Sequence, residues 1–314
     1  MKGALGTLRI DSTEESGGVN WLRSLPFLGV HGVCLAAFWT GVSGRALVLC
    51  FALYVIRMFG ITAGYHRYFA HRSYRTSRAF QFALALIAST AEQKGPLWWA
   101  AHHRHHHQYS DQVEDAHSPG RRGFWWSHVG WFMSDWYHAT PLEAIKDFSR
   151  YPELVWLNHY WVVPGIFLGA ACFLAMGWQG LVVGFFVSTV LLYHGTFVIN
   201  SLCHMIGSVR YKTTDTSRNS MILALITLGE GWHNNHHHYA TSARMGFFWW
   251  EIDMSYYVLR ALSIFGVVWD LKNPNPRVLE AGRTRSTAMP KTDSEALRAW
   301  VSGLCDVDEE RPTE

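Results

Sequence analysis

Long apolar runs constrain the fold of this chain more than any other feature of its sequence. Four of them cover residues 26–43, 46–63, 155–176 and 179–203. Each approaches the roughly 20 residues that a helix needs to cross the hydrocarbon of a bilayer. Little more than Gly44 and Arg45 separates the first two runs, and the last two break near Gly177. The sequence therefore predicts an all-α integral membrane protein in which four transmembrane helices form two hairpins.

The composition agrees with a membrane location. Hydrophobic residues make up 49% of the 314 residues and charged residues only 16%, whereas soluble domains carry about 25% charged residues. Shorter apolar stretches at 80–90, 221–228 and 258–269 fall short of a span, so we expect interfacial or buried helices there.

The apolar runs divide the chain into three parts. Residues 1–25 are polar and lack the apolar core of a cleavable signal peptide, so we expect a cytoplasmic N-terminal segment. Residues 26–273 would form the membrane domain. Residues 274–314 are polar and charged, and we expect a mobile tail.

Basic residues indicate the orientation in the membrane. Ten Arg and Lys side chains lie between the second and third runs, and the hairpin turns opposite hold almost none. By the positive-inside rule, regions 64–154 and 204–273 and both termini are cytoplasmic. We expect a multi-pass protein of a bacterial cell membrane.

Three histidine clusters fall in these cytoplasmic regions, at 66–71, 102–107 and 233–238. Imidazole is the commonest metal-binding side chain. At 3.6 residues per turn His66 and His71 lie about 140° apart, which favours contact with two different ions. In the third cluster His233, His236 and His237 share one helical face, so three nitrogens can converge.

The middle cluster is ambiguous by spacing alone. His102 with His105 and His106 satisfies the same template as His103 with His106 and His107. Geometry on a helix does not choose between the two sets.

Five ordered motifs lie within about residues 45–270, namely GYHRYFAHRSY, WAAHHRHHH, RRGFWWSHVGW, NSLCH and GEGWHNNHHH. In order and spacing they resemble those of membrane fatty-acyl desaturases of the stearoyl-CoA Δ9 type, which are integral-membrane di-iron enzymes. The family's middle box reads His-Arg-x-His-His, which selects His103, His106 and His107 and leaves out His102 and His105. The family's Asn-Ser-x-x-His element implies a ninth ligand at His204, with Asn200 reaching the metal through a water. The implied metal shell is His66, His71, His103, His106, His107, His204, His233, His236, His237 and, through water, Asn200.

The other histidines receive less specific interpretations. His105 and His238 are expected to orient ligands as hydrogen-bond partners, and His117 and His128 to orient ligands or the substrate head. The histidines expected to serve packing, hydrogen bonding or a loop are His31, His138, His159 and His194.

The resemblance implies a reaction and its partners. The reduced centre of two irons would use O2 as co-substrate to place a cis double bond at Δ9 of a saturated acyl-CoA. The chain contains no Rossmann, P-loop or haem-attachment motif. Electrons would therefore come from a separate ferredoxin-, rubredoxin- or cytochrome b5-type protein. We expect no nucleic-acid partner.

The resemblance specifies the acyl carrier less closely than it specifies the reaction. Acyl-CoA members of animals usually have Arg-Asp before the middle box, where this chain has Ala101 and His102. Acyl-CoA is the first expectation, and acyl carrier protein and phospholipid stay open.

Three rival hypotheses remain. Membrane di-iron hydroxylases and ketolases use similar histidine boxes and insert oxygen, but NSLCH and GEGWHNNHHH favour the desaturase. A membrane metal transporter would place ionisable residues inside its spans, whereas the clusters lie outside them. A structural zinc site takes four ligands, fewer than the nine imidazoles implied here.

Overall fold

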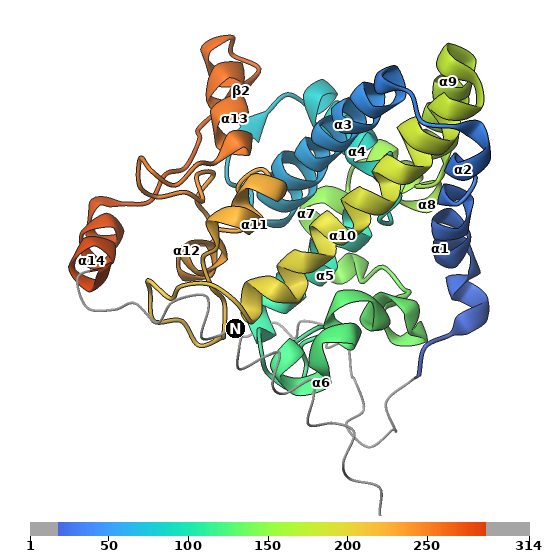
Figure 1. Cartoon of the computed structure of the whole chain (residues 1–314). Coiled ribbons are helices and arrows are strands. Elements are labelled where there is room, and N and C mark those ends of the chain that lie inside the picture. Colours follow the sequence, from blue (N-terminus) through green and yellow to red (C-terminus); the bar gives the residue numbers. More distant parts are fainter. Residues whose placement is uncertain (1–17, 287–314) are drawn as a thin grey trace, which may run out of the picture.

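The computed structural model describes residues 18–286, and within this range the chain is mostly helical (Figure 1). The one regular sheet among the described residues is an antiparallel pair between β1 (Arg75–Thr76) and β2 (Val268–Trp269). Arg75 pairs with Trp269 and Thr76 with Val268. The expected all-α class therefore holds except for this short ladder, which ties the segment after the second apolar helix to the C-terminal part of the described chain.

Three apolar helical stretches are long enough to cross a membrane: Trp21–Thr40, Gly44–Ala70 and Val163–His204. The first contains α1 (Trp21–Cys34) and α2 (Ala37–Thr40). The second contains α3 (Gly44–Phe59) and the π-helix η1 (Gly60–Ala70). The third contains α9 (Val163–Gln179), the π-helix η6 (Gly180–Val187), α10 (Ser188–Asn200) and the short 3₁₀ turn η7 (Leu202–His204).

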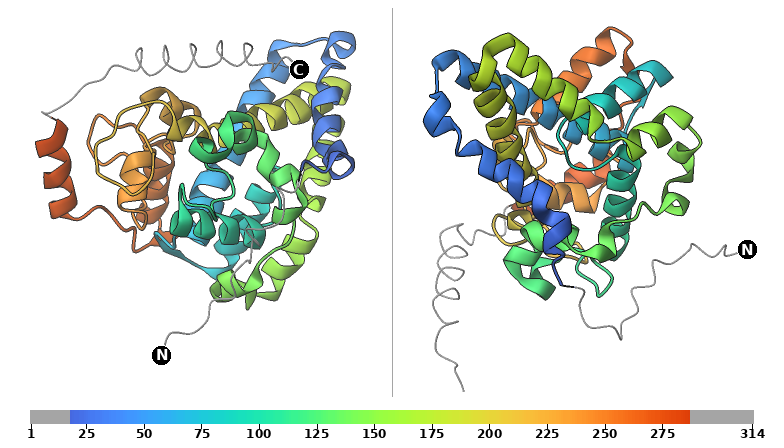
Figure 2. Two further views of the ribbon diagram at one scale, coloured as in Figure 1. Left: turned by 90° about the horizontal axis from the view of Figure 1, so that it is seen from below. Right: turned by 90° about the vertical axis from the view of Figure 1, so that its right-hand side faces the viewer.

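The third stretch folds back on itself, so it has two legs. Gly177 lies at the reversal with φ 59° and ψ −148°, a conformation that residues with a Cβ rarely adopt. Gly180 packs so closely that a Cβ there would lie 2.1 Å from the carbonyl oxygen of Cys172. The first two stretches follow each other in the chain, but α1 and α3 pack mainly on η6 and α10 of the third stretch and not on each other. Figure 2 (right) shows α1 beside the third stretch. Four crossings remain a prediction.

Arg57 interrupts the second apolar run and faces the bundle interior, as such a residue is expected to do. Its side chain is 1% exposed. The guanidinium donates to Thr189 Oγ1 at 2.7 Å and to Ser188 Oγ, both on α10. Neutral hydroxyls from one hairpin therefore satisfy the cation of the other and join the two hairpins.

Short helices between and after the hairpins form the polar half of the molecule. The segment between the hairpins contains α4 (Arg78–Ser89), α5 (Pro96–Tyr109), α6 (Pro119–Trp125), η2 (Trp126–Gly130), η3 (Trp131–Met133), η4 (Asp135–Tyr137), η5 (Leu142–Ile145), α7 (Lys146–Ser149) and α8 (Pro152–His159). After the second hairpin come α11 (Met221–Ile226), α12 (His233–His238), α13 (Met254–Ile264) and α14 (Pro276–Ser286). The main core lies where α4, α5 and η1 pack together.

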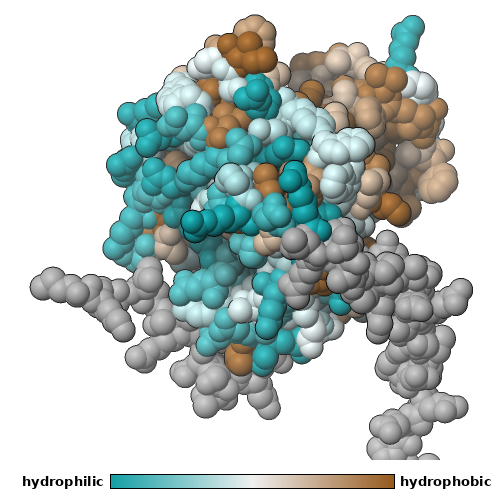
Figure 3. Space-filling model, turned by 90° about the vertical axis from the view of Figure 1, so that its left-hand side faces the viewer, coloured by the Kyte–Doolittle hydropathy of each residue, from teal (hydrophilic) through white to brown (hydrophobic). Residues whose placement is uncertain are grey.

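The short apolar stretches differ in burial. Helix α4 buries Leu84, Ala85 and Ala88 in the main core. Helices α11 and α13 instead leave apolar side chains such as Ile222 (71% exposed) and Ile264 (78% exposed) on the surface. The face that carries α14 is largely polar, with apolar surface toward its upper edge (Figure 3). This pattern supports the interpretation of α11 and α13 as interfacial helices.

The segment expected to be a mobile tail begins with an ordered helix. Tyr211 Oη donates to the carbonyl oxygen of Val278 at 3.0 Å. Val278 and Leu279 of α14 pack on the cluster of Tyr211, Phe247 and Phe248. Aromatic burial therefore docks the polar-looking residues 276–286, and residues 287–314 of the expected tail lie outside the described part.

Candidate metal centre

A π-helix presents the first histidine pair to the interior. In η1 the backbone bonds follow the i→i+5 pattern, and the amide of His71 donates to the carbonyl oxygen of His66 at 3.2 Å. One π turn therefore places the two imidazoles on one side, with ring centroids 4.9 Å apart. The expectation that the pair addresses two different ions is wrong, because it assumed 3.6 residues per turn. π-helical turns often mark functional sites.

Helices α5 and α12 each divide their histidines between two directions. His103 and His107 are four residues apart and face the first pair, with His103 Nε2 2.9 Å from His71 Nε2. His106 points elsewhere on α5. On α12, His236 turns toward His66, whereas His233 and His237 turn toward His204. The prediction that the three nitrogens of α12 converge is therefore wrong, because His236 joins one group and His233 and His237 join the other.

The nitrogens of nine histidines gather in two adjacent groups. The five-histidine group contains His66, His71, His103, His107 and His236, and the four-histidine group contains His106, His204, His233 and His237. Within each group the ligand atoms lie within 4.8 Å of one another. The groups touch through His107 and His237, whose ring centroids are 4.4 Å apart. The structure therefore brings together all nine imidazoles that the family resemblance implied, and it leaves His102 and His105 outside both groups.

The spacing of the nitrogens fits metal ligation. Nε2 of His236 lies 2.9 Å from Nε2 of His66 and 2.9 Å from Nε2 of His107. Two nitrogens bound at right angles to one ion, each about 2.1 Å from it, lie about 3 Å apart. A neutral imidazole carries a single N–H, so three Nε2 atoms around one point are better explained as ligands than as hydrogen-bonded partners.

Three aspartates surround the four-histidine group. Asp115 Oδ1 lies 3.0 Å from His106 Nδ1, and Asp215 Oδ2 lies 2.7 Å from His237 Nδ1. Asp111 Oδ2 is 3.7 Å from His204 Nδ1. Such carboxylates orient a ring and direct its other nitrogen toward a metal. No role of these aspartates was predicted from the sequence, because no spacing rule connects them to the histidine boxes.

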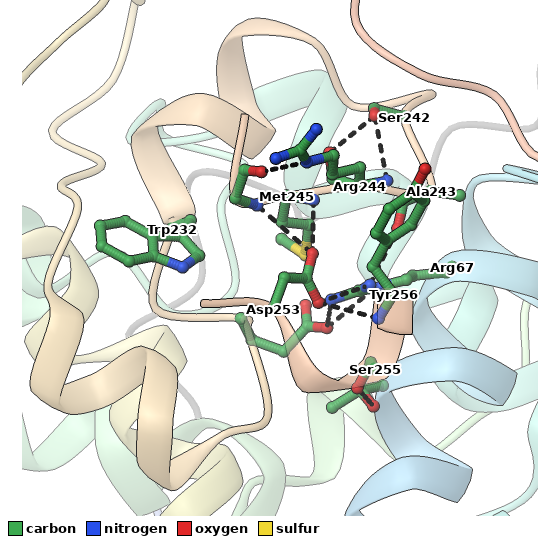
Figure 4. Close-up of polar contacts among 12 residues, drawn as sticks. Arg67, Trp232, Ser242, Ala243, Arg244, Met245, Asp253, Ser255 and Tyr256 are labelled. Atoms are coloured by element: carbon green, nitrogen blue, oxygen red, sulfur yellow. Dashed lines mark hydrogen bonds and ion pairs between the residues drawn. The ribbon is translucent and has the colours of Figure 1, made fainter. Parts of the chain in front are cut away.

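Among the described residues, one carboxylate pairs with a ring of the five-histidine group. Glu230, 2% exposed, pairs with His66 Nδ1. Its other oxygen accepts from Arg67 at 2.9 Å, and Arg67 also pairs with Asp253 at 2.9 Å. Figure 4 shows Arg67 of η1 meeting Asp253, which in turn accepts from the amide of Met245 at 2.7 Å. The first histidine box is therefore fixed by a buried ion network. The GEGWHNNHHH motif contained Glu230, but its role was not predicted.

The pKa values of the buried imidazoles differ between the five-histidine and the four-histidine group. Burial, reinforced by neighbouring imidazoles, lowers the pKa of His71, His103, His107 and His236 well below 6.5. Burial also acts to lower the pKa of His106, but the charge of Asp115 outweighs it and raises that pKa. Burial lowers the pKa of His237 to about 4 although Asp215 opposes the shift. Most of these rings are therefore neutral at pH 7, the state that binds metal.

The other histidines occupy distinct places. His117 packs against His106 with ring centroids 4.3 Å apart and the ring planes tilted, near Asp115. Its orienting role stays a prediction. His105 packs on Tyr109 and His238 on Tyr211. The expectation that His105 and His238 orient ligands is therefore wrong, because aromatic neighbours take up both rings outside the centre.

Three more histidines form a chain. His128 lies 3.0 Å from His194, and His194 lies 3.1 Å from His31. Hydrogen bonding was the expected role for His31 and His194. His128 was expected near ligands or the substrate head, and it instead ends this chain on Ser201 Oγ at 3.0 Å.

Asn200 ends α10 beside the centre and lines a cavity. Its backbone carbonyl accepts from Ser127 Oγ at 2.8 Å. Within residues 18–286 its side-chain amide makes no hydrogen bond. A free amide suits the predicted contact through water, which stays a prediction.

The cavity has a volume of about 260 Å³ and runs from the surface to the centre. Buried residues at its inner end include Gln93, Trp131 and His117, and His103 joins them there. Gln93 Nε2 donates to Thr196 Oγ1 at 3.0 Å across this inner end. Aromatic side chains form much of the wall, so the cavity suits an apolar chain.

Comparisons with known proteins agree with these observations. The family model described as fatty acid desaturase matches residues 44–265. The chain belongs to the fatty acid desaturase family. It is 37% identical over 268 residues to the sn-1 stearoyl-lipid 9-desaturase of Anabaena variabilis, covering 83% of this chain and 97% of that protein. It is 39% identical over 264 residues to Delta-9 acyl-lipid desaturase 2 of Arabidopsis thaliana, covering 82% of each. It is also 35% identical over 275 residues to the acyl-CoA C20 Delta5-desaturase of Anemone leveillei, covering 83% of this chain and 88% of that one.

Family membership confirms the expected class of enzyme, an oxidoreductase of lipid metabolism that desaturates fatty-acyl chains. The histidine groups of this desaturase fit a metal centre with two ions, and its apolar helices fit a membrane location. The hydroxylase and transporter hypotheses are not favoured.

Proposed function

We propose that this desaturase places a cis double bond at Δ9 of a saturated fatty-acyl chain, with iron in both histidine groups. The observation that carries the proposal is the convergence of nine imidazoles in two adjacent groups beside an aromatic cavity. The Δ9 position is supported by the names of relatives such as the Anabaena and Arabidopsis proteins. The Δ5 relative makes the position a point to measure.

The nine histidines would hold the two irons, and Asn200 would contribute through a water. With O2, two electrons and two protons, the iron centre supplies the chemistry that removes two hydrogens from adjacent methylenes and releases two waters. The residues of this chain position the reaction. The aromatic walls exclude water, and the contact between Gln93 and Thr196 shapes the inner end where the acyl chain meets the histidines.

The carboxylates keep the ligands in place. Asp115 and Asp215 hold the Nδ1 sides of His106 and His237, and Glu230 holds that of His66. Each ring then keeps its Nε2 free for metal. We also propose that both termini and both histidine regions are cytoplasmic, because the ten basic residues between the hairpins favour that side. A soluble ferredoxin-, rubredoxin- or cytochrome b5-type donor would then reach the centre from the cytoplasm.

The test is expression in a desaturase-null host with a compatible electron donor, followed by mass spectrometry of the fatty acids with localisation of the double bond. A new Δ9 monoene supports the proposal. A hydroxylated or ketone product would overturn it in favour of an oxygenase. Metal analysis of the purified chain should give about two irons per chain, and zinc alone would contradict the iron assignment.

A further inference from the structure

An unbroken series of hydrogen bonds runs from the metal centre into the apolar helices. His128 Nδ1 lies 3.0 Å from Ser201 Oγ, and His128 Nε2 lies 3.0 Å from His194 Nδ1. His194 Nε2 lies 3.1 Å from His31 Nε2, and His31 Nδ1 lies 2.8 Å from the carbonyl oxygen of Phe27. Both nitrogens of all three imidazoles therefore have a partner. We call Ser201, His128, His194 and His31 the histidine line.

The histidine line joins segments that are far apart in the sequence. His31 lies on α1 and His194 on α10, both within stretches that are long and apolar enough to cross a membrane. His128 comes from η2, within the RRGFWWSHVGW motif, which contributes none of the nine clustered histidines. Ionisable residues inside apolar spans are costly, and chains of them mark proton paths.

The carbonyl group of Phe27 fixes the direction of every bond in the line. A carbonyl oxygen only accepts, so His31 Nδ1 donates, and a neutral His31 accepts at Nε2. His194 therefore donates from Nε2 and accepts at Nδ1 from Nε2 of His128. His128 in turn accepts at Nδ1 from the hydroxyl of Ser201. Each ring accepts on one side and donates on the other, which is the arrangement that a proton carrier needs.

Exposure decreases along the line toward the metal centre. His31 and His194 are partly exposed, whereas His128 is 6% exposed and Ser201 is fully buried. Burial, reinforced by the neighbouring His194, lowers the pKa of His128 to about 4. The ring of His128 is therefore neutral at pH 7, so it can pass a proton on without storing it. The end at His31 is the entrance.

The inner end of the line meets the segment that carries a candidate ligand. The carbonyl oxygen of Ser201 accepts from the amide of His204 at 3.1 Å. Ser201 directly follows Asn200, whose side chain lines the cavity. Ser127, the neighbour of His128, donates to the carbonyl oxygen of Asn200 at 2.8 Å. Two consecutive residues of η2 thus hold the end of α10 beside the centre.

We propose that the histidine line is a proton relay that supplies the desaturation reaction. This inference rests on the proposed function, in which each double bond consumes two protons. A second proton on His31 makes the bonds of the line point inward. His31 then gives the proton on Nε2 to His194 Nε2, and His194 gives the one on Nδ1 to His128 Nε2. His128 gives the proton on Nδ1 to Ser201 Oγ, and the hydroxyl releases its own proton to the water expected at Asn200.

This passage moves one proton and no electrons. The rings of His194 and His128 each lose one N–H bond and gain another, so they end as the other neutral tautomer. His31 loses one positive charge, and the proton ends on an oxygen atom that leaves as water. A purely structural line would behave differently, because its contacts near Ser201 would matter to the centre and its far contact at His31 would not.

The test breaks the line at both ends in the full-length, iron-loaded protein with donor and O2, using stearoyl-CoA and stearoyl phosphatidylcholine as substrates. His31→Asn and His128→Asn place an amide near the position of Nδ1 and remove Nε2. The first variant therefore keeps the contact with Phe27, and the second keeps the contact with Ser201. We expect kcat to fall about a hundredfold in both, the lower end of what a positioned proton carrier contributes. KM and iron per chain should not change. A normal kcat in His31→Asn overturns the proposal.

A matched control and a measurement without turnover complete the test. His159→Asn replaces an exposed histidine that packs on Tyr160 outside the line, and kcat should not change. In the full-length chain loaded with zinc, ¹⁵N NMR should find one proton between each facing pair of nitrogens in the line, and a pair without a proton overturns the relay. If His128→Asn loses iron, His194→Asn, farther from the centre, replaces it. A wild type that forms no double bond with either substrate contradicts the proposed function instead.

Discussion

The two histidine groups contain similar ligands but stand in different surroundings. In the five-histidine group one buried glutamate holds one ring, and behind it Arg67 and Asp253 complete a buried ion network. In the four-histidine group three aspartates face three of four rings. The five-histidine group has more imidazoles, and the four-histidine group has more carboxylates facing its rings. Two adjacent groups of similar ligands are therefore held in place by different kinds of neighbours.

Ligand loss should have the largest effect and should differ between the groups. His233→Ala leaves three imidazoles in one group, and His236→Ala leaves four in the other. We expect both variants to lose desaturation, and His233→Ala to lose more iron because fewer ligands remain. Iron per chain and double-bond formation are the measurements. His238→Ala, on the same helix but stacked on Tyr211, is the matched control. Equal iron contents in the two variants would contradict the expected difference between the two groups.

The buried ion network should be the main stability element behind the five-histidine group. Arg67→Ala leaves Glu230 and Asp253 buried without their cation. Breaking such a pair costs about 3–5 kcal/mol. Thermal unfolding should show a large loss of stability, whereas Arg78→Ala, which breaks an exposed pair with Glu153, should change the stability little because exposed pairs are screened by solvent. A small effect of Arg67→Ala would mean that the network contributes little.

The aspartates should matter through their histidines. Asp215→Asn weakens the orientation of His237, and we expect iron affinity or activity to fall about 10- to 100-fold. Glu230→Gln provides the equivalent change beside His66 in the other group. Iron titration of both variants measures how much Asp215 and Glu230 each contribute to iron affinity. If Asp215→Asn binds iron like the wild type, the aspartates are not tuning the four-histidine group.

Acid should destabilise the metal-free protein gradually, mainly through the five-histidine group. Burial lowers the folded-state pKa of His103 and His107 well below 6.5. Below pH 6.5 the unfolded chain therefore binds protons that the folded chain does not, and the free energy of unfolding falls. The raised pKa of His106 acts in the opposite direction, because its stabilising contribution is present below pH 6.5 and is lost as pH rises. Melting temperatures of chelator-treated protein between pH 5 and 7.5 test this, and a flat profile would contradict it.

Much of the architecture was predictable because it depends on local composition. Apolar runs of sufficient length indicate helices in lipid whatever surrounds them. The reversal within the third stretch followed from Gly177. The docking of α14 was not predictable, because Val278 and Leu279 find their partners at Tyr211 and Phe248, far away in the sequence.

The sequence by itself determined which nine histidines gather. The boxes place imidazoles at fixed helical intervals, and the family motifs select nine of 18 histidines, including His204. Only the tertiary structure decided how these nine divide. A π-helix brings His66 and His71 together, and the packing of α12 sends His236 to one group and His233 to the other. The carboxylates that surround the two groups also appear only in three dimensions. The physical reason is that helical periodicity is a local property, whereas the direction in which a helix faces depends on all its neighbours.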